Sequence, residues 1–227
     1  MSVITISREF GSDGDAIAHR VAQRLDYHFV DKKFIGHVLG QYGYVEFDKE
    51  YETLPGFWER FNAQRGKQRE VIVQMLNRVI EAVAQHGNVV ILGRSGFEVL
   101  GRFADVLHVR VQAPLGVRIG RIMEKHNISF DQAEEMVKEN DKVRLAFVEE
   151  FYKVPWKTVD VFDLVINTGK IPSELAVDWI VEAVQNRMLE YEISTAPVSS
   201  DIVVDHILAE AISETFDCQI FHHKQVW

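Results

Sequence analysis

The chain has 227 residues, of which 47% are hydrophobic and 26% are charged, and its formal net charge is -9. This balance is ordinary for a soluble globular protein, and it excludes the disordered, fibrous and collagen-like classes. The net negative charge argues against general affinity for nucleic acid or for an anionic membrane. A small phosphorylated substrate is compatible with it, because such a site needs only a local cluster of positive charge.

The termini and the cysteine content indicate the compartment. The N-terminus lacks a basic region followed by a long apolar stretch, so it is not typical of a signal peptide. No apolar run approaches the length that spans a membrane. The one cysteine, Cys218, cannot form an intramolecular disulfide. We therefore expect a cytoplasmic protein that binds neither nucleic acid nor membrane.

Short β-branched segments alternate along the chain with segments whose apolar residues recur at helical spacing. We predict strands over residues 3–6, 27–30, 88–92, 106–111 and 162–166. We predict helices over residues 16–25, 71–85, 115–125, 130–152 and 172–189, with a further helix that begins at Lys32 and is capped by Asp31. The alternation predicts an α/β fold in which a five-stranded, mostly parallel sheet lies between two layers of helices.

Two segments fall outside this alternation. Residues 41–70 interleave aromatic side chains with charges, which predicts an irregular or helical insert over a site. Residues 193–227 follow the last helix of the pattern. Within them, residues 199–201 are typical of a helix start, and residues 202–216 carry an apolar stripe. We interpret this C-terminal helical extension either as a docking appendage or as the interface of a homodimer.

A glycine loop connects the first predicted strand to the first predicted helix. In that context the backbone N–H groups of the loop and the dipole of the helix favour an anion. The loop runs from Ser7 and contains Gly11 and Gly14. Two glycines also suit a tight structural turn, and it is the strand–loop–helix context that favours phosphate binding.

A second glycine segment, from Gly93 to Gly96, follows the strand predicted over residues 88–92 and contains Arg94. Ligands bind at the carboxyl ends of the strands in an open parallel sheet, so this arginine is expected at the same edge as the glycine loop. The fork of a guanidinium group suits a phosphate. The alternative is a surface arginine in a glycine turn.

Positive side chains recur in the helices predicted over residues 115–125 and 130–152. Arg118 and Arg121 are three residues apart and therefore share a helix face. Individually, such charges usually solvate an exposed helix. As a set they match phosphoryl transfer, which needs several cations to offset the charge of the transferring group. The set is Arg118, Arg121, Lys125, Lys138, Lys142 and Arg144.

Five short segments follow one another in the order of a known family. The most specific is residues 4–12, which read ITISREFGS. The others are residues 27–31, 90–94, 141–144 with 151–152, and 162–168. Together they resemble the cytidylate kinase-like family, relatives of bacterial cytidylate kinase among the P-loop nucleoside monophosphate kinases. The resemblance implies a P-loop NTPase fold of three αβα layers, with a kinase-like domain over residues 1–192 and an extension over residues 193–227.

The resemblance implies a donor site for ATP with magnesium. The donor phosphates would lie on the loop formed by Gly11, Ser12, Asp13, Gly14, Asp15 and Ala16. Residues 115–155 would form the lid that closes over the donor. The catalytic arginines would be Arg8, Arg118, Arg121 and Arg144, with Asp141 beside the last of them in the lid.

The resemblance also implies an acceptor site for a nucleoside monophosphate. Asp31 and Arg94 would face this acceptor, and Arg94 would hold its phosphate. Residues 41–70 would take the place of the acceptor-binding insert. Phe57 and Trp58 in that insert would either stack on a base or pack in the core.

The loop departs from the P-loop consensus, which ends in Gly-Lys-Ser/Thr. Gly14 stands where the lysine belongs, and Asp15 or Ala16 stands where the magnesium-binding hydroxyl belongs. Arg8 is the nearest substitute cation. Asp13 and Asp15 would repel a polyphosphate unless a cation intervenes, and they are also the candidate magnesium ligands.

Three hypotheses follow from the sequence. The leading one is a magnesium-dependent kinase that transfers the γ-phosphoryl group of ATP to a (d)CMP-like acceptor. The absent lysine and the added carboxylates favour a second hypothesis, a nucleotide-binding or regulatory protein of the same fold without catalytic activity. The atypical insert at residues 41–70 leaves a third open, a kinase for another small molecule.

Overall fold

The computed structural model describes residues 2–43, 63–155, 158–190 and 196–224. Within these residues, five strands form one sheet in the spatial order β2-β3-β1-β4-β5, and each pairing is parallel. The strands are β1 (Val3–Arg8), β2 (His28–Val30), β3 (Val89–Leu92), β4 (Val106–Gln112) and β5 (Leu164–Asn167). The predicted five-stranded parallel sheet is confirmed.

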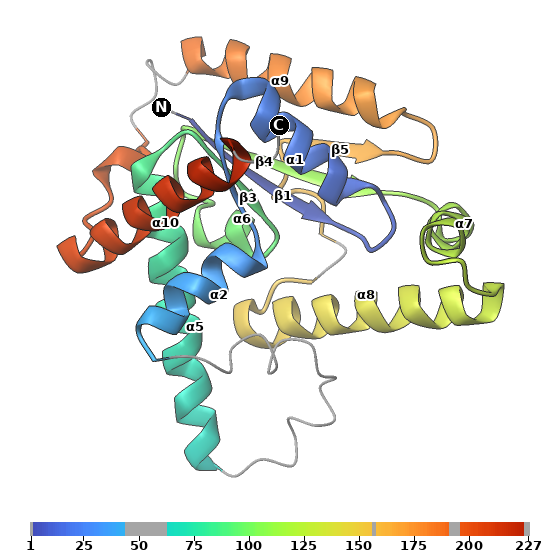
Figure 1. Ribbon diagram of the computed structural model, residues 1–227, viewed down its shortest axis with the longest axis horizontal. Helices are drawn as coiled ribbons and strands as arrows, with labels where there is room; N and C mark the ends of the chain where they lie inside the picture. Colours follow the sequence, from blue (N-terminus) through green and yellow to red (C-terminus); the bar gives the residue numbers. More distant parts are fainter. Residues whose placement is uncertain (1, 44–62, 156–157, 191–195, 225–227) are drawn as a thin grey trace.

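Helices cover both faces of this sheet and produce three layers (Figure 1). One face carries α1 (Gly14–Leu25) and α9 (Ser173–Glu190), and the other carries α2 (Lys32–Gln41) and α5 (Ala63–His86). The remaining helices of this part are the short α6 (Gly96–Val99), then α7 (Leu115–His126) and α8 (Phe130–Tyr152). Helices α7 and α8 lie near the carboxyl ends of the strands (Figure 1). The three-layer αβα class is therefore confirmed.

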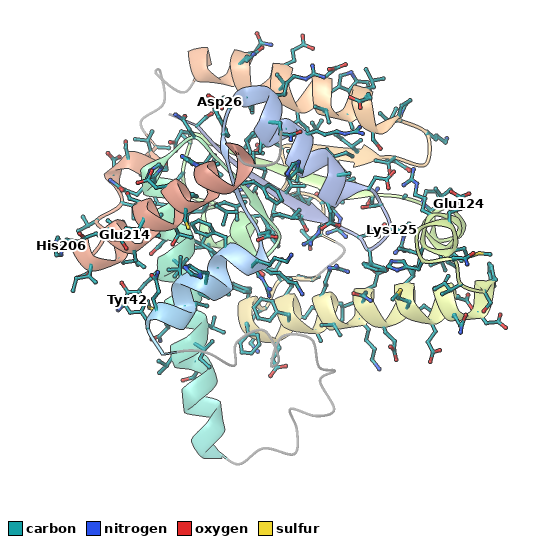
Figure 2. The ribbon with its side chains drawn as sticks, in the orientation of Figure 1. Asp26, Tyr42, Glu124, Lys125, His206 and Glu214 are labelled. Carbon is teal, nitrogen blue, oxygen red and sulfur yellow. The ribbon has the colours of Figure 1, made fainter. Side chains whose placement is uncertain are left out.

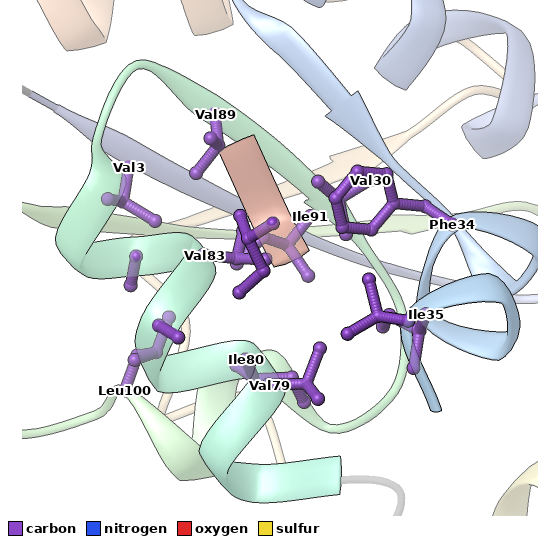
Figure 3. Packing of buried hydrophobic residues seen from close by; sticks show 14 of the residues in the cluster. Val3, Val30, Phe34, Ile35, Val79, Ile80, Val83, Val89, Ile91 and Leu100 are labelled. Carbon is purple, nitrogen blue, oxygen red and sulfur yellow. The ribbon is translucent and has the colours of Figure 1, made fainter. Parts of the chain in front are cut away.

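Side-chain alternation along β1 supplies both apolar layers. Ile4 and Ile6 point into the cluster beneath α1 and α9, together with Ile17 and Ile180. Val3 points to the opposite face and joins the cluster that α2 and α5 cover, shown in Figure 3. Because both faces of the sheet are apolar, helices must bury each of them.

Helices α7 and α8 share a small apolar cluster of their own. Ile119 of α7 packs with Val137 of α8, and Phe10 of the glycine loop packs against this cluster. The other end of α8 is attached to α5, because the hydroxyl of Tyr152 donates to Oδ1 of Asn77 at 2.7 Å. The two helices therefore contact the glycine loop at one end and α5 at the other. A lid function for residues 115–155 stays a prediction.

The C-terminal extension begins differently from the prediction. Ser199–Asp201 form a 3-10 turn, η2, and α10 (His206–Lys224) begins only after an extended segment. The predicted helix start at Ser199 is wrong, because Ser199 forms hydrogen bonds with Asp105, the residue that precedes β4. Its N–H and hydroxyl donate to the two carboxylate oxygens of buried Asp105, at 2.7 and 2.5 Å. Asp205 caps α10 instead, and its carboxylate accepts from the amide of Ile207 at 3.0 Å.

Helix α10 packs on α2 and α5 through three buried side chains, Leu208, Ile212 and Phe216. Phe216 is 1% exposed, and its ring centre lies 4.1 Å from that of His28 and 4.7 Å from that of Phe34. The ring of His86 lies 4.8 Å away. The extension thus adds to the same apolar cluster that α5 and β2 supply. The boundary at residues 192–193 and a homodimer formed through the extension stay predictions.

Several element boundaries differ from those predicted, most of them by one or two residues, and the largest difference is at the start of α5. Helix α5 begins at Ala63, well before residue 71, because the apolar stripe that indicates a helix starts only after a polar first part. Strand β5 begins at Leu164, after Phe162. The middle of the predicted insert, residues 44–62 with Phe57 and Trp58, lies outside the described residues.

No helix in the described part of the chain is both long and apolar enough to cross a membrane. The cytoplasmic location stays a prediction.

Candidate functional site

The carboxyl ends of β1 and β3 lie side by side at one edge of the sheet. Ile6 pairs with Leu92 in the parallel register, and the amide of Gly93 donates to the carbonyl oxygen of Ile6 at 2.9 Å. The glycine loop after β1 and the segment that contains Arg94 therefore emerge together. This edge is where open parallel sheets bind ligands.

The glycine loop turns sharply between β1 and α1. Gly11 has a φ of 78° and Asp13 a φ of 62°, both in the left-handed region that favours glycine. A Cβ on Gly11 would also lie 3.0 Å from the carbonyl oxygen of Arg118. The buried hydroxyl of Ser12 holds the turn by donating to the carbonyl oxygen of Glu9 at 2.8 Å. The turn leads directly into the first amides of α1, which have no acceptor within the helix and suit an anion.

Arg118 and Arg121 support this loop from α7. Arg118 is 7% exposed, donates to the carbonyl oxygen of Phe10 at 3.2 Å and pairs with Asp141 of α8 at 2.6 Å. Arg121 pairs with the carboxylate of Asp13 at 3.3 Å. Both guanidinium groups therefore bond to protein acceptors in this structure. Their predicted contact with a transferring phosphoryl group stays a prediction.

Three arginines from different elements form a cluster beside the loop: Arg8 ends β1, Arg94 follows β3, and Arg144 lies on α8. The guanidinium of Arg8 extends over Gly93, where any Cβ would overlap with its Nη1. Nε of Arg8 and Nη1 of Arg144 are buried and have no hydrogen-bond partner among the described residues. The ring centre of Phe10 lies 5.4 Å from Cζ of Arg144. Buried donors without acceptors are costly, so the cluster has the groups that an anion would satisfy.

Electrostatic strain in the cluster is evident at Arg144. The pKa of Arg144 falls to about 10, first because the group is buried and next because of the charge of Arg8. Asp15 and Asp141 oppose this shift, and Arg94 adds to it. The guanidinium keeps its charge at neutral pH. The arginine cluster is therefore a concentrated positive site in a chain whose net charge is negative.

Asp31 caps α2, as predicted. Its Oδ1 accepts from the amides of Lys33 and Phe34 at 2.9 and 3.0 Å. Helix capping therefore accounts for both hydrogen bonds that this oxygen accepts. A contact between Asp31 and an acceptor nucleotide stays a prediction.

Polar residues on β1 and β4 extend the site in a way that the sequence did not predict. His108 and Arg110 interrupt the apolar pattern of β4 and are buried. Oγ1 of Thr5 lies 2.7 Å from Nδ1 of His108. Burial lowers the pKa of Arg110, while Glu9 and Asp141 raise it, so this buried charge is electrostatically coupled to the loop and to α8. The break in the apolar pattern of β4 was the available sequence signal.

Two hydroxyl groups, one just after β5 and one at the start of α9, also support the loop. Thr168 donates to the carbonyl oxygen of Ser12 at 2.8 Å and accepts from Nη1 of Arg121 at 3.0 Å. Ser173, at the start of α9, donates to the carboxylate of Asp13 at 3.2 Å. No local pattern predicts these contacts, because the partners lie far apart along the chain.

The two predicted magnesium ligands are both paired with arginines. Asp13 lies 3.3 Å from Arg121, and Asp15 lies 2.9 Å from Arg8. Among the described residues, no group of three or more His, Cys, Asp or Glu side chains is placed to hold a metal ion. Magnesium that enters with a nucleotide needs only one or two protein carboxylates, because phosphates and water supply its other ligands.

Comparison with known proteins identifies the family. A model described as the cytidylate kinase-like family matches residues 3–170. The matched span contains all five described strands, the glycine loop and the arginine cluster. The chain belongs to the cytidylate kinase-like family. The resemblance seen in the short segments is thereby confirmed.

Individual relatives of this cytidylate kinase-like chain differ in how much they cover. The cytidylate kinase of Ignicoccus hospitalis is 29% identical over 180 residues, which span 79% of this chain and 97% of that protein. A uronate isomerase of Corynebacterium glutamicum is 36% identical over 104 residues, but the match spans only 20% of that protein. A solved structure of an uncharacterized protein from Eubacterium ventriosum has a TM-score of 0.62 at 19% identity, over 82% of this chain and 99% of that one. This last likeness shows the fold alone.

Arg8 packs closely against Gly14, the residue that stands where the P-loop lysine belongs. A Cβ on Gly14 would lie 2.5 Å from Cβ of Arg8 and 2.9 Å from its Cγ. Any side chain at Gly14 would therefore displace Arg8. Arg8 extends instead from the end of β1 over the loop and pairs with Asp15. The cation at the loop comes from the strand and not from the helix.

Proposed function

We propose that this chain is a kinase that transfers the γ-phosphoryl group of ATP to a nucleoside monophosphate of the (d)CMP type. The observation that carries this proposal is the arginine cluster of Arg8, Arg94 and Arg144 beside the glycine loop, with two buried guanidinium nitrogens that lack a partner among the described residues. Phosphoryl transfer depends mainly on positioning and on offsetting the charge of the transferring group. Membership of the cytidylate kinase-like family and the name of the Ignicoccus relative support the same reading.

The reacting groups divide between the loop and the arginine cluster. The amides from Gly11 to Gly14 and the guanidinium of Arg8 hold the donor phosphates at the start of α1. Arg94 holds the phosphate of the acceptor. Arg144 offsets charge on the transferring group, and its burial strengthens that interaction because water does not screen it.

Arg118 and Arg121 are positioning residues in this proposal, in place of the direct role predicted from the sequence. Their contacts with Phe10 and Asp13 hold the loop in the shape that presents its amides. A substitution at either arginine would therefore act on the loop first and on transfer second.

Magnesium fits the chemistry of the loop. Asp13 and Asp15 supply carboxylate oxygens, which are the ligands that magnesium prefers, and the donor phosphates supply the others. Bound there, magnesium would neutralise charge on the donor phosphates. Both carboxylates already pair with arginines, so these pairs must loosen when the ion binds.

The test measures transfer from ATP to CMP, dCMP, UMP, AMP and GMP by the intact protein and by Arg94→Ala. We expect a (d)CMP-type acceptor to be preferred and Arg94→Ala to lower kcat/KM about a hundredfold. Arg24→Ala is the matched control, because Arg24 is half-exposed on the outer side of α1 and pairs with Asp178. Unchanged transfer by Arg94→Ala would contradict the proposal that Arg94 holds the phosphate of the acceptor. No transfer to any acceptor would remove the kinase proposal.

A second candidate function is nucleotide binding without transfer. The observation that favours it is the carboxylate of Asp15, which pairs with Arg8 next to a glycine that stands where the lysine belongs. Binding of ATP without transfer to any monophosphate would support this candidate. A kinase for another small molecule is the third candidate, and transfer to a non-nucleotide acceptor would support it.

A further inference from the structure

The arginine cluster already contains an anion that belongs to the protein. Oδ1 of Asp15 lies 2.9 Å from Nη2 of Arg8. Asp15 follows Gly14 in the first turn of α1, at the end of the helix that favours an anion. Asp15 is one of the two residues that stand where phosphate loops carry a neutral hydroxyl, and its side chain is negative.

Asp15 is held in its ionised form by its surroundings. Burial raises the pKa of Asp15, but the charge of Arg8 and its hydrogen bond lower it. Arg144 and Lys125 lower it as well, so that the net shift is downward. Lys125 is labelled on α7 in Figure 2. Positive side chains from three elements, β1, α8 and α7, therefore favour the ionised form of this carboxylate.

A phosphate can nevertheless replace Asp15 as the partner of Arg8 at a low cost in stability. The side chain of Asp15 is 59% exposed and that of Arg8 is 18% exposed. Ion pairs with one partner this open to water contribute little to stability. A phosphate carries more charge than a carboxylate and more oxygens that accept from guanidinium groups. It is thus a stronger partner for Arg8 than Asp15 is.

The cluster also has donors that Asp15 does not reach. Nε of Arg8 and Nη1 of Arg144 stay without a partner among the described residues. The other nearby carboxylate, Asp141, is bonded to Arg118 at 2.6 Å and to the amide of Phe10 at 3.2 Å. Among the described residues, Asp15 therefore leaves both of these donors without an acceptor.

We propose that Asp15 is an internal counter-ion, which occupies the arginine cluster of the empty protein and competes with a polyphosphate for Arg8. This proposal rests on the assignment of the cluster to phosphates in the proposed function. Entry of a polyphosphate breaks the ion pair of Arg8 and Asp15 and leaves the carboxylate to water or to a metal ion. The residue therefore weakens binding of singly charged anions most, and selects for polyphosphates.

A purely structural role for Asp15 makes a different prediction. A carboxylate in the first turn of a helix stabilises that helix through its dipole. If this is its only role, Asp15→Asn lowers the free energy of unfolding slightly and leaves anion affinity unchanged. If Asp15 is a counter-ion, Asp15→Asn must bind anions more tightly than the unmodified chain does.

The experiment is calorimetric titration of the full chain with inorganic tripolyphosphate in the presence of EDTA. The variants are Asp15→Asn and Asp15→Ser, of which the second restores the hydroxyl of phosphate loops. Asp178→Asn is the matched control. It removes the same charge from another Arg–Asp pair, Arg24 and Asp178, at a similar distance of 3.0 Å on the outer side of α1 and α9.

We expect either Asp15 variant to bind tripolyphosphate about tenfold more tightly than the unmodified chain, because a competing negative charge is gone. The affinity of Asp178→Asn for tripolyphosphate should stay within about twofold of that of the unmodified chain. The pair of Arg24 and Asp178 is exposed and lies outside the arginine cluster. Equal or weaker binding by folded Asp15 variants overturns the proposal. Absence of tripolyphosphate binding by every variant overturns it as well, because a displaceable counter-ion requires a site that takes the anion.

The outcomes also separate this proposal from the kinase proposal. Tighter tripolyphosphate binding by the Asp15 variants, with no transfer from ATP, supports the counter-ion and removes the kinase. Transfer by the unmodified chain, with no gain in affinity for the Asp15 variants, supports the kinase and removes the counter-ion.

Discussion

Two regions of the molecule, the packing around Phe216 and the arginine cluster around Arg8, differ in what holds them together. Phe216 is 1% exposed and is surrounded by aromatic rings of β2, α2 and α5. Around Arg8, like charges lie close together and two buried nitrogens have no partner among the described residues. Apolar burial in the first region stabilises the fold, whereas like charges and buried donors without acceptors in the second region are costly.

This difference predicts which part of the chain a bound anion would stabilise. Burial of apolar area stabilises the folded chain whether or not anything is bound. In the proposed function, an anion that brings charge and acceptors would stabilise the arginine cluster further. An anion that binds only the folded state also raises the free energy of unfolding by mass action. Substitutions in the two regions should therefore separate stability from binding.

The largest effect on stability is expected from Phe216→Ala. Removing a buried ring leaves a cavity between α10, α2 and β2, and such changes cost about 3–5 kcal/mol. The free energy of unfolding in guanidinium chloride measures this loss. Ile207→Ala on the same helix is the control, because Ile207 is 59% exposed and should cost little. A loss below about 1 kcal/mol for Phe216→Ala would show that α10 does not belong to the core.

An intermediate effect on stability, with a large effect on binding, is expected from Gly14→Ala. The added Cβ overlaps with Arg8, and overpacking of this kind costs about 1–3 kcal/mol. Displacement of Arg8 should also weaken tripolyphosphate binding at least about tenfold. Gly120→Ala, in the interior of α7 with nothing within 4 Å of its added Cβ, should instead raise stability by about 1 kcal/mol. Unchanged binding by Gly14→Ala would show that Arg8 does not hold the anion.

The smallest effect is expected from the titration of His28 beside Phe216. Burial lowers the pKa of His28 and the charge of His86 lowers it further, while Asp217 and Asp26 oppose the shift. The neutral ring is therefore favoured in the folded chain. This contribution is fully present above the ordinary value of 6.5 and is lost as the pH falls through the lowered pKa. It should be only a fraction of the loss caused by Phe216→Ala.

Thermal unfolding between about pH 8 and pH 5 measures the contribution of His28. His28→Phe keeps an aromatic ring but cannot titrate, so its unfolding midpoint should fall less across this range than that of the unmodified chain. His126→Gln, at the exposed end of α7, should leave the pH dependence unchanged. Identical profiles for His28→Phe and the unmodified chain would contradict the assignment.

Local patterns predicted most of the fold because they involve neighbouring residues. The β-branched run of β1, the glycine loop and the periodic apolar residues of α1 all lie within the first part of the chain, and each is visible without knowledge of any partner. Asp31 was predicted as a cap for the same reason. Ser199 was assigned wrongly because its partner, Asp105, lies far away along the chain, and the competing bond outweighs the local preference.

The site was predictable as a set of residue types and not as a set of pairs. Arg8, Arg94 and Arg144 were all identified from motifs and charge, and the structure places them in one cluster. His108 and Arg110 were noticed only as interruptions of a strand. Their burial beside the site follows from the parallel register of β1 and β4, which no local pattern contains.

The sequence by itself determined the order of strands and helices and the position of the glycine loop, because periodicity and motif spacing are properties of short segments. Its resemblance to known sequences indicated the kinase-like family. Only the tertiary structure decided which charges pair: Asp15 with Arg8, Asp13 with Arg121, and Asp141 with Arg118. The physical reason is that the energy of a charge pair depends on distance and on burial. Neither quantity exists until segments far apart in the chain have packed against one another.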